Sequence, residues 1–245
     1  LDHRGENDNL ENAIKLLQES IHLDASFGPA YLSLATAYAL MPYYRNLPVV
    51  ETNRAAIQTV EKGIATDPRI KSAAGAIYGS HYHQQKRWSE SEAAYRLATT
   101  AQVQDSTPFN WYSRMLNSVG RLDDALEQAL KAELIDPDNG VVNSRLAIVY
   151  TWLGDSERAH DYFGRADELG GTSTIHNLAY GLLLIREGRI ADAENMALAA
   201  VRMGEGSTEW IQPVFAAFED PSLADIAFAA HKRVAAENTL EPEVE

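Results

Sequence analysis

Apolar residues recur three and four residues apart along most of the chain, and short glycine or polar segments separate one such run from the next. This spacing predicts pairs of amphipathic helices joined by tight turns. The pattern also repeats, because small, apolar and turn residues return every 34 residues between Ser106 and Met203. The recurring residues are Tyr112, Ser113, Leu116, Gly120, Ala125, Ala129 and Ala132, then Leu146, Ala147, Tyr150, Gly154, Ala159, Phe163 and Ala166, then Tyr180, Gly181, Leu184, Gly188, Ala193, Ala197 and Ala200.

Turn residues mark where the two helices of each unit, A and B, meet and where each unit ends. Gly120, Gly154 and Gly188 precede helix B, and glycine can take the left-handed backbone angles that close helix A. The Asp67-Pro68 and Asp136-Pro137 pairs are expected to end helix B, because proline disfavours helix for the residue before it. The recurring alanines allow neighbouring helices to approach within about 8 Å.

A 34-residue period with small residues at these places resembles the tetratricopeptide repeat (TPR), whose unit is a helix–turn–helix hairpin. The resemblance implies an all-α protein, a right-handed superhelical solenoid of TPR repeats. Such stacks present extended surfaces on which other proteins bind.

The frame divides residues 1–240 into a single array. Residues 28–68 form a repeat with a loop inserted at Met41 to Pro48, and 72–103 is degenerate, since Ser91 replaces an alanine and Lys86-Arg87 the turn glycine. The partner helix of a first, partial repeat is expected to lie upstream of Leu1 or to be missing. Leu1 is not a start methionine, so the chain is interpreted as a piece of a longer protein. The predicted units are 9–24 (partial), 28–68, 72–103, 106–137, 140–171, 174–205 and 208–240 (a degenerate cap), followed by an acidic tail at 241–245.

Composition narrows the classes of partner. The 35 acidic and 21 basic residues give a formal net charge of −14, which disfavours nucleic acid binding through this segment. The absence of cysteine excludes disulfides and thiolate metal sites. No stretch approaches the roughly 18 apolar residues that span a bilayer, so membrane insertion is not expected. A soluble location, cytoplasmic or periplasmic, is left open.

The chain carries none of the sequence motifs of common catalytic, nucleotide or metal sites. The closest histidine pair, His81 and His83, is two residues apart, where helical side chains point to different faces. We therefore expect no enzymatic activity, no cofactor and no metal.

In TPR arrays the partner peptide usually lies against helix A. The resemblance therefore implies a binding groove, in which arginine can bind a carboxylate through two hydrogen bonds and tryptophan offers a rigid contact face. The alternative is that Trp111 and Trp152 pack between helices and that the arginines balance nearby acids. The candidate residues are Asn110, Trp111, Arg114, Asn117, Ser144, Arg145, Ile148, Thr151, Trp152, Leu178, Leu182, Ile185 and Arg186.

The segment from Leu10 to Ala35, the Pro/Tyr loop after it and the helix ending at Thr66-Asp67-Pro68 resemble a more specific arrangement. It is similar to the TPR region of bacterial regulators that carry an N-terminal winged-helix or class III adenylate cyclase domain. This implies a non-catalytic scaffold that binds a protein or peptide as the sensory or regulatory part of a larger regulator. The alternative is an oligomerisation module that makes a homodimer, and so dimerises an attached output domain, through the ends of the array or through Tyr43, Tyr44 and Leu47 of the insertion loop.

Overall fold

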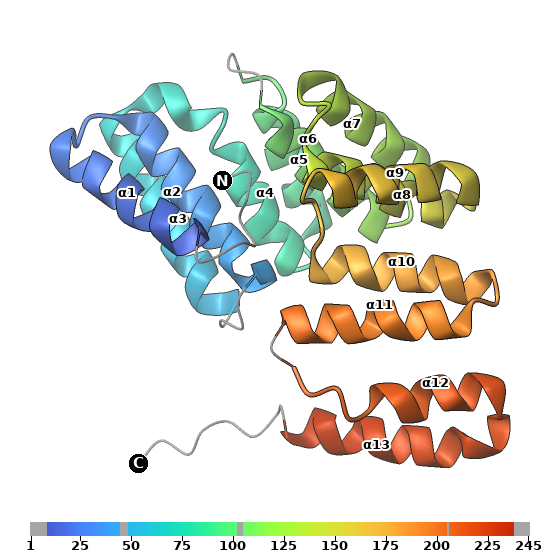
Figure 1. Cartoon of the computed structure of the whole chain (residues 1–245). Coiled ribbons are helices and arrows are strands. Elements are labelled where there is room, and N and C mark those ends of the chain that lie inside the picture. Colours follow the sequence, from blue (N-terminus) through green and yellow to red (C-terminus); the bar gives the residue numbers. More distant parts are fainter. Residues whose placement is uncertain (1–8, 45–48, 102–104, 205, 238–245) are drawn as a thin grey trace, which may run out of the picture. The chain divides into compact units, whose positions relative to one another are not determined.

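The computed structural model describes residues 9–44, 49–101, 105–204 and 206–237, without the side chains of 43–44 and 235–237. Within these ranges the regular structure is entirely helical, as Figure 1 shows. The chain divides into two compact units, residues 1–172 and 173–245, which are described separately.

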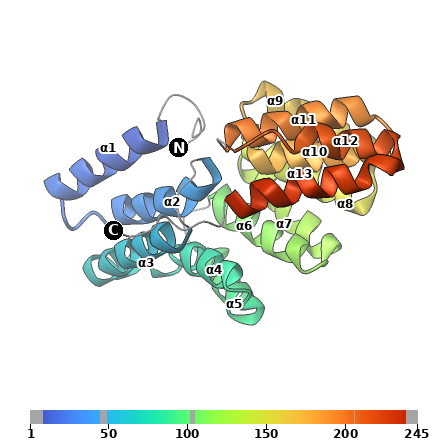
Figure 2. The same cartoon turned by 90° about the horizontal axis from the view of Figure 1, so that it is seen from below.

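Unit 1 consists of helical hairpins. Helix α1 packs against α2, and the pairs α2/α3, α4/α5, α6/α7 and α8/α9 pack as successive hairpins, several of which are seen from below in Figure 2. The elements are α1 (Asn9–Leu23), α2 (Gly28–Tyr44), α3 (Val49–Thr66), the 3₁₀ helix η1 (Pro68–Lys71), α4 (Gly75–Gln84), α5 (Trp88–Ala98), α6 (Ser106–Ser118), α7 (Leu122–Ile135), α8 (Gly140–Leu153) and α9 (Ser156–Glu168).

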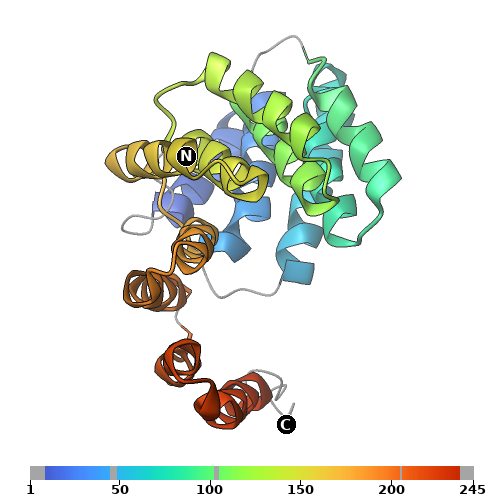
Figure 3. The same ribbon diagram turned by 90° about the vertical axis from the view of Figure 1, so that its right-hand side faces the viewer.

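Unit 2 continues the same construction with two further hairpins. Helix α10 packs against α11, α11 against α12, and α12 against α13. Figure 3 views the first of these pairs nearly along the helix axes. The elements are α10 (Thr174–Arg186), α11 (Ile190–Met203), α12 (Ile211–Glu219), the 3₁₀ helix η2 (Pro221–Leu223) and α13 (Ala224–Glu237).

Polar side chains cap the first turn of several helices. Asp105 accepts a hydrogen bond from the Thr107 N–H at the start of α6, and Asn139 accepts one from the Val141 N–H at the start of α8. Each cap satisfies a backbone donor that has no partner within the helix. The Asp-Pro pairs end helices as expected, since α3 stops at Thr66 and α7 at Ile135.

The turns between helices A and B share one backbone geometry. Gly120, Gly154 and Gly188 have φ of 77°, 81° and 75°, as their place in the repeat predicts. In the degenerate repeat Lys86 occupies the same place with φ of 58°, although a side chain disfavours this region. In all four turns the residue after the left-handed one donates its N–H to the carbonyl five residues earlier, at 2.9 to 3.0 Å. A shared hydrogen-bond pattern therefore imposes the left-handed angle on a lysine.

Small residues allow the helices of each hairpin to lie close together. Ala125, Ala159 and Ala193 recur at one position of helix B and are fully buried. Ser91 takes this position in the degenerate repeat, and its hydroxyl donates to the carbonyl of Gly79 at 2.7 Å. The buried serine is thus satisfied by the neighbouring helix, as a buried polar group requires.

The insertion after the first full helix A differs from the loop that its two prolines suggested. Helix α2 continues through Tyr44 and contains Pro42. Leu40 and Met41 are buried in the core of unit 1, so the apolar stripe of α2 extends into the predicted loop. This burial outweighs the backbone hydrogen bond that a proline inside a helix removes.

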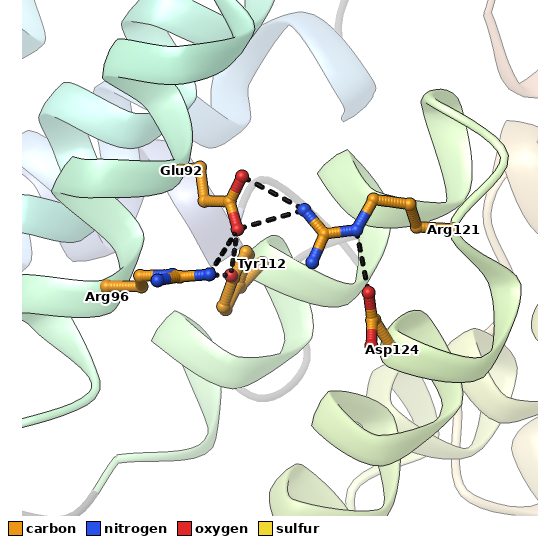
Figure 4. A network of polar contacts seen from close by, with 5 residues as sticks. All are labelled: Glu92, Arg96, Tyr112, Arg121 and Asp124. Atoms are coloured by element: carbon orange, nitrogen blue, oxygen red, sulfur yellow. Dashed lines mark hydrogen bonds and ion pairs between the residues drawn. The ribbon is translucent and has the colours of Figure 1, made fainter.

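A polar network joins the hairpin α4/α5 to the hairpin α6/α7 (Figure 4). The Glu92 carboxylate on α5 accepts hydrogen bonds from Arg96 at 2.7 Å, from the Tyr112 hydroxyl at 3.0 Å and from Arg121 at 2.9 and 3.0 Å. Arg121 also donates to Asp124 at 2.6 Å. Burial alone would raise the pKa of Glu92, but these donors hold it below its usual value.

We expect Glu92→Gln to lower the free energy of unfolding by about 1–3 kcal/mol, because the amide cannot accept from three donors as a carboxylate does. Urea denaturation at neutral pH measures the change. Glu127→Gln, which removes a surface ion pair with Lys131, is the control and should cost less than about 1 kcal/mol. Equal losses in the two variants would contradict a structural role for the network.

The left-handed lysine gives a second test. Lys86→Gly should raise the free energy of unfolding by about 1 kcal/mol, and Gly154→Ala should lower it by a similar amount. A Cβ at Gly154 would meet no atom within 4 Å, so the loss would reflect backbone conformation alone. Lys86→Ala is the control, because it removes the side chain and keeps the strained angle. A glycine variant no more stable than the alanine variant would refute this explanation.

Candidate partner-binding face

Polar side chains from three successive A helices of unit 1 gather on one surface, which we call the helix-A face. Arg114 donates to the Ser80 hydroxyl at 3.3 Å across the gap between α6 and α4. The His83 Nε2 atom lies 3.2 Å from the Ser118 hydroxyl, which links the same two helices. The face comprises His83 of α4, Arg114, Asn117 and Ser118 of α6, and Arg145 of α8, together with Ser80 of α4, which is 1% exposed and lies beneath Arg114.

The repeat itself produces this clustering. Ser80 and Arg114 are 34 residues apart, so they hold the same position in consecutive units. Stacked units place equivalent positions side by side. The guanidinium of Arg114 also lies 5.8 Å from the centre of the Trp111 ring, within the range of a cation–π contact.

His83 lies in a positively charged environment on this face. Burial and the positive charges of Arg114 and Arg145 lower the pKa of His83 to about 4. Each cause disfavours the imidazolium. His83 is therefore neutral at physiological pH, and its ring packs against Trp88 with 5.5 Å between the ring centres. Its Nδ1 atom and the Asn117 Oδ1 atom are buried and have no hydrogen-bond partner among the described residues.

The predicted groove residues of unit 1 divide by exposure. Trp111 is 4% exposed and belongs to the core, which agrees with the alternative that it packs between helices. Trp152, by contrast, is 48% exposed at the end of α8. Four further predicted groove residues are buried as well; they are Asn110, Ser144, Ile148 and Thr151. Arg114, Asn117 and Arg145 are half-buried.

The groove residues predicted in α10 lie in unit 2, whose surface is described by itself. Leu178 is 49% exposed and Ile175 is 37% exposed, and Leu182 and Ile185 are half-buried on the same helix. Spacings of three and four residues place these four on one helical face. Arg186, at the end of α10, is exposed. The surface is apolar, in contrast to the polar helix-A face of unit 1.

Sequence reasoning did not include Ser80 and His83 in the groove. The 34-residue period could have identified them, because Ser80 and His83 hold the positions of Arg114 and Asn117 one repeat earlier.

The predicted self-association residues fall largely outside the part of the chain that the structure describes. Leu47 and the side chains of Tyr43 and Tyr44 lie outside the described residues. Among the described residues, no three His, Asp or Glu side chains gather as a metal site would require. None of the described helices combines the length and the apolar character needed to cross a bilayer.

Comparisons with known proteins bear on the fold. No protein-family model matches the chain. The chain is 38% identical over 82 residues to DnaJ homolog subfamily C member 3 of Rattus norvegicus, which covers 34% of this chain and 16% of that protein. It is 22% identical over 158 residues to anaphase-promoting complex subunit 3 of Schizosaccharomyces pombe, which covers 64% of this chain and 24% of that protein. The chain thus spans about a quarter or less of the curated relatives that it matches.

The decisive likeness is structural. A chain in the crystal structure of the APC/C hetero-tetramer Cut9–Hcn1 matches with a TM-score of 0.70 at 13% identity, over 96% of this chain and 45% of that one. The chain has a TPR fold. The consecutive packed hairpins and the repeated left-handed turns are the local features of this fold.

Acid titration tests the surroundings of His83 in this TPR array. In the unfolded state His83 takes up a proton near its usual pKa of about 6.5, whereas in the folded state it does so only near 4. Between these values the unfolded state binds more protons, so stability falls as the pH falls. Between about pH 7 and about pH 4.5, the free energy of unfolding should fall by about 1–2 kcal/mol less in His83→Gln than in the wild type. This energy is discounted for solvent screening because the side chain is partly exposed.

Urea denaturation at the two pH values measures this difference. His22→Gln, a change at an exposed histidine of α1, is the control. An identical loss of stability in the wild type and His83→Gln would contradict the assignment.

Proposed function

We propose that the chain is a non-catalytic protein-interaction scaffold that binds a partner segment on the helix-A face of unit 1. The observation that carries the proposal is the helix-A face itself, where Arg114 bonds to Ser80 of the preceding A helix and Arg114 and Arg145 both lower the pKa of His83, within a chain whose formal net charge is −14. Positive charge concentrated on one face of an acidic protein favours a partner with complementary acidic groups. Following the sequence resemblance, the scaffold serves as the sensory or regulatory part of a larger bacterial regulator.

The face suits the binding of a peptide because its polar groups are already held in place. Arg114 is fixed by Ser80 and by the Trp111 ring, and His83 by Ser118 and Trp88. Preformed side-chain positions reduce the entropy lost on association. Trp152, exposed on the neighbouring helix α8, is of the residue type most often found among binding hot spots.

Two further observations support a role in protein association. The matched TPR structure is a hetero-tetramer of Cut9 with Hcn1, so a protein of this fold assembles with another protein there. The apolar face of α10 in unit 2 offers a second region suited to a partner, because exposed aliphatic clusters mark interaction sites.

Selection and titration of peptides test the proposal. Peptides selected from a display library on the whole chain are titrated by fluorescence anisotropy. Arg114→Ala and Arg145→Ala should each weaken the selected peptides by about tenfold, because a guanidinium contact is lost. Arg165→Ala, which removes an arginine of α9 paired with Glu133, is the control and should leave the affinity unchanged. Unchanged affinity in both helix-A-face variants would refute the proposed site.

Self-association is the second candidate function, and one observation favours it. Helix α13 exposes 60% of Ile226 and 63% of Phe228, whereas the outer helix of a capping repeat is expected to be polar. Light scattering over a range of protein concentrations separates the two functions. A monomer at every concentration would contradict the dimer, and a dimer dissociated by Phe228→Ser would support it.

A further inference from the structure

A cavity lies between helices α5 and α7 of unit 1, with α6 as its floor. Its volume is about 500 Å³, which is within the range of pockets that hold small ligands or side chains. On α6 the cavity is lined by the half-buried Phe109 and by the buried side chains of Tyr112 and Leu116, and its other lining residues are polar or charged. The Glu92 network of Figure 4 fixes the lining residues Arg96 and Arg121.

One repeat later, the same place is filled by a tyrosine. Tyr162 of α9 stacks on Tyr150 of α8, with ring centres 5.6 Å apart and 18° between the planes. The Tyr162 hydroxyl donates to the Glu133 carboxylate of α7 at 3.0 Å, so its side chain bridges three helices. The guanidinium of Arg165 lies 5.3 Å from the centre of the ring. The junction is thus closed by an aromatic ring, an acceptor for its hydroxyl and a cation beside its face.

The 34-residue register identifies the residues of α5, α6 and α7 that occupy the equivalent positions at the cavity. Tyr162 corresponds to Gln128, Tyr150 to Leu116 and Glu133 to Thr99. Gln128 and Thr99 line the cavity, and neither carries a ring. Arg165 corresponds to Lys131, which also lines the cavity and keeps the cation in place. The cavity therefore lies where the next junction holds a tyrosine side chain.

We propose that this cavity binds a tyrosine side chain supplied by a partner protein. The ring would occupy the position that Tyr162 holds one repeat later, above Leu116 and Tyr112. Lys131 would lie beside the face of the ring, as Arg165 does beside Tyr162. Gln128 and Thr99 carry the polar groups that would meet the phenol hydroxyl.

The occupant is expected to come from another molecule. The residues outside the described ranges contain no phenylalanine, tyrosine or tryptophan, and helix α2, which ends with Tyr43 and Tyr44, packs against α1, α3 and α4. Phe109 and Tyr112 already form part of the wall. The site is separate from the helix-A face, so this inference does not depend on the proposed peptide site there.

The test uses p-cresol, which is the side chain of tyrosine, as the probe. Titration into the whole chain, followed by ¹H–¹⁵N NMR, should give saturable shifts at Gln128, Thr99 and Lys131, with a dissociation constant on the order of millimolar. Cyclohexanol, of similar size but without a π system, should bind more weakly. The absence of saturable shifts at these residues would overturn the proposal.

Variants distinguish this cavity from other places where p-cresol could bind. Thr99→Glu combined with Gln128→Tyr rebuilds the Glu133–Tyr162 pair in the cavity and should abolish the shifts. Lys131→Ala, which leaves the cavity open, should weaken binding about twofold to fivefold through the lost cation–π contact. Arg69→Ala, at an exposed residue of η1, is the control for a lost surface charge and should change nothing. Undiminished binding in the double variant, or in Lys131→Ala if the double variant does not fold, would contradict the assigned site.

Discussion

The close contact between helices at the small-residue positions is the constraint on which the structure depends. Ala125 and Ala159 are completely buried between their own helix and its neighbour, and Ser91 occupies the same place only because its hydroxyl bonds to a backbone carbonyl. A larger side chain there would separate the helices and alter the stacking of the following units. Because the contacts recur in one register, equivalent positions of consecutive hairpins become neighbours, as Ser80 and Arg114 do.

Because equivalent positions are neighbours, a single residue that differs between two repeats can change the local surface. On the helix-A face, one repeat position holds Ser80 in α4 and Arg114 in α6, and the arginine donates a hydrogen bond to the serine hydroxyl of the neighbouring helix. Between the B helices, Gln128 lines the cavity between α5 and α7, whereas Tyr162, its equivalent one repeat later, bonds to Glu133. In a repeat array the departures from the common pattern therefore carry the information about function, whereas the common pattern carries the fold.

The sequence predicted the parts of the fold that depend on local chemistry. The left-handed glycines and the Asp-Pro helix ends follow from backbone preferences, and the structure has them where expected. Tertiary packing decided the rest. Met41 is buried, so helix α2 continues through a predicted loop, and the shared turn geometry forces Lys86 into a glycine conformation. Likewise Trp111 and Trp152 both lie on A helices, and only the surrounding helices determine that one is buried and the other exposed.

Helix α6 connects the two candidate sites. Arg114 lies on the helix-A face, whereas Tyr112 and Leu116, two residues away on either side, form the floor of the cavity between α5 and α7. Residues two apart on a helix point in widely different directions, so one helix supplies both surfaces without conflict. Under the two proposals, a partner segment on one surface would leave the other accessible, and a single partner could engage both at once. Because two linked contacts bind more tightly than either alone, weak individual sites are sufficient for stable association.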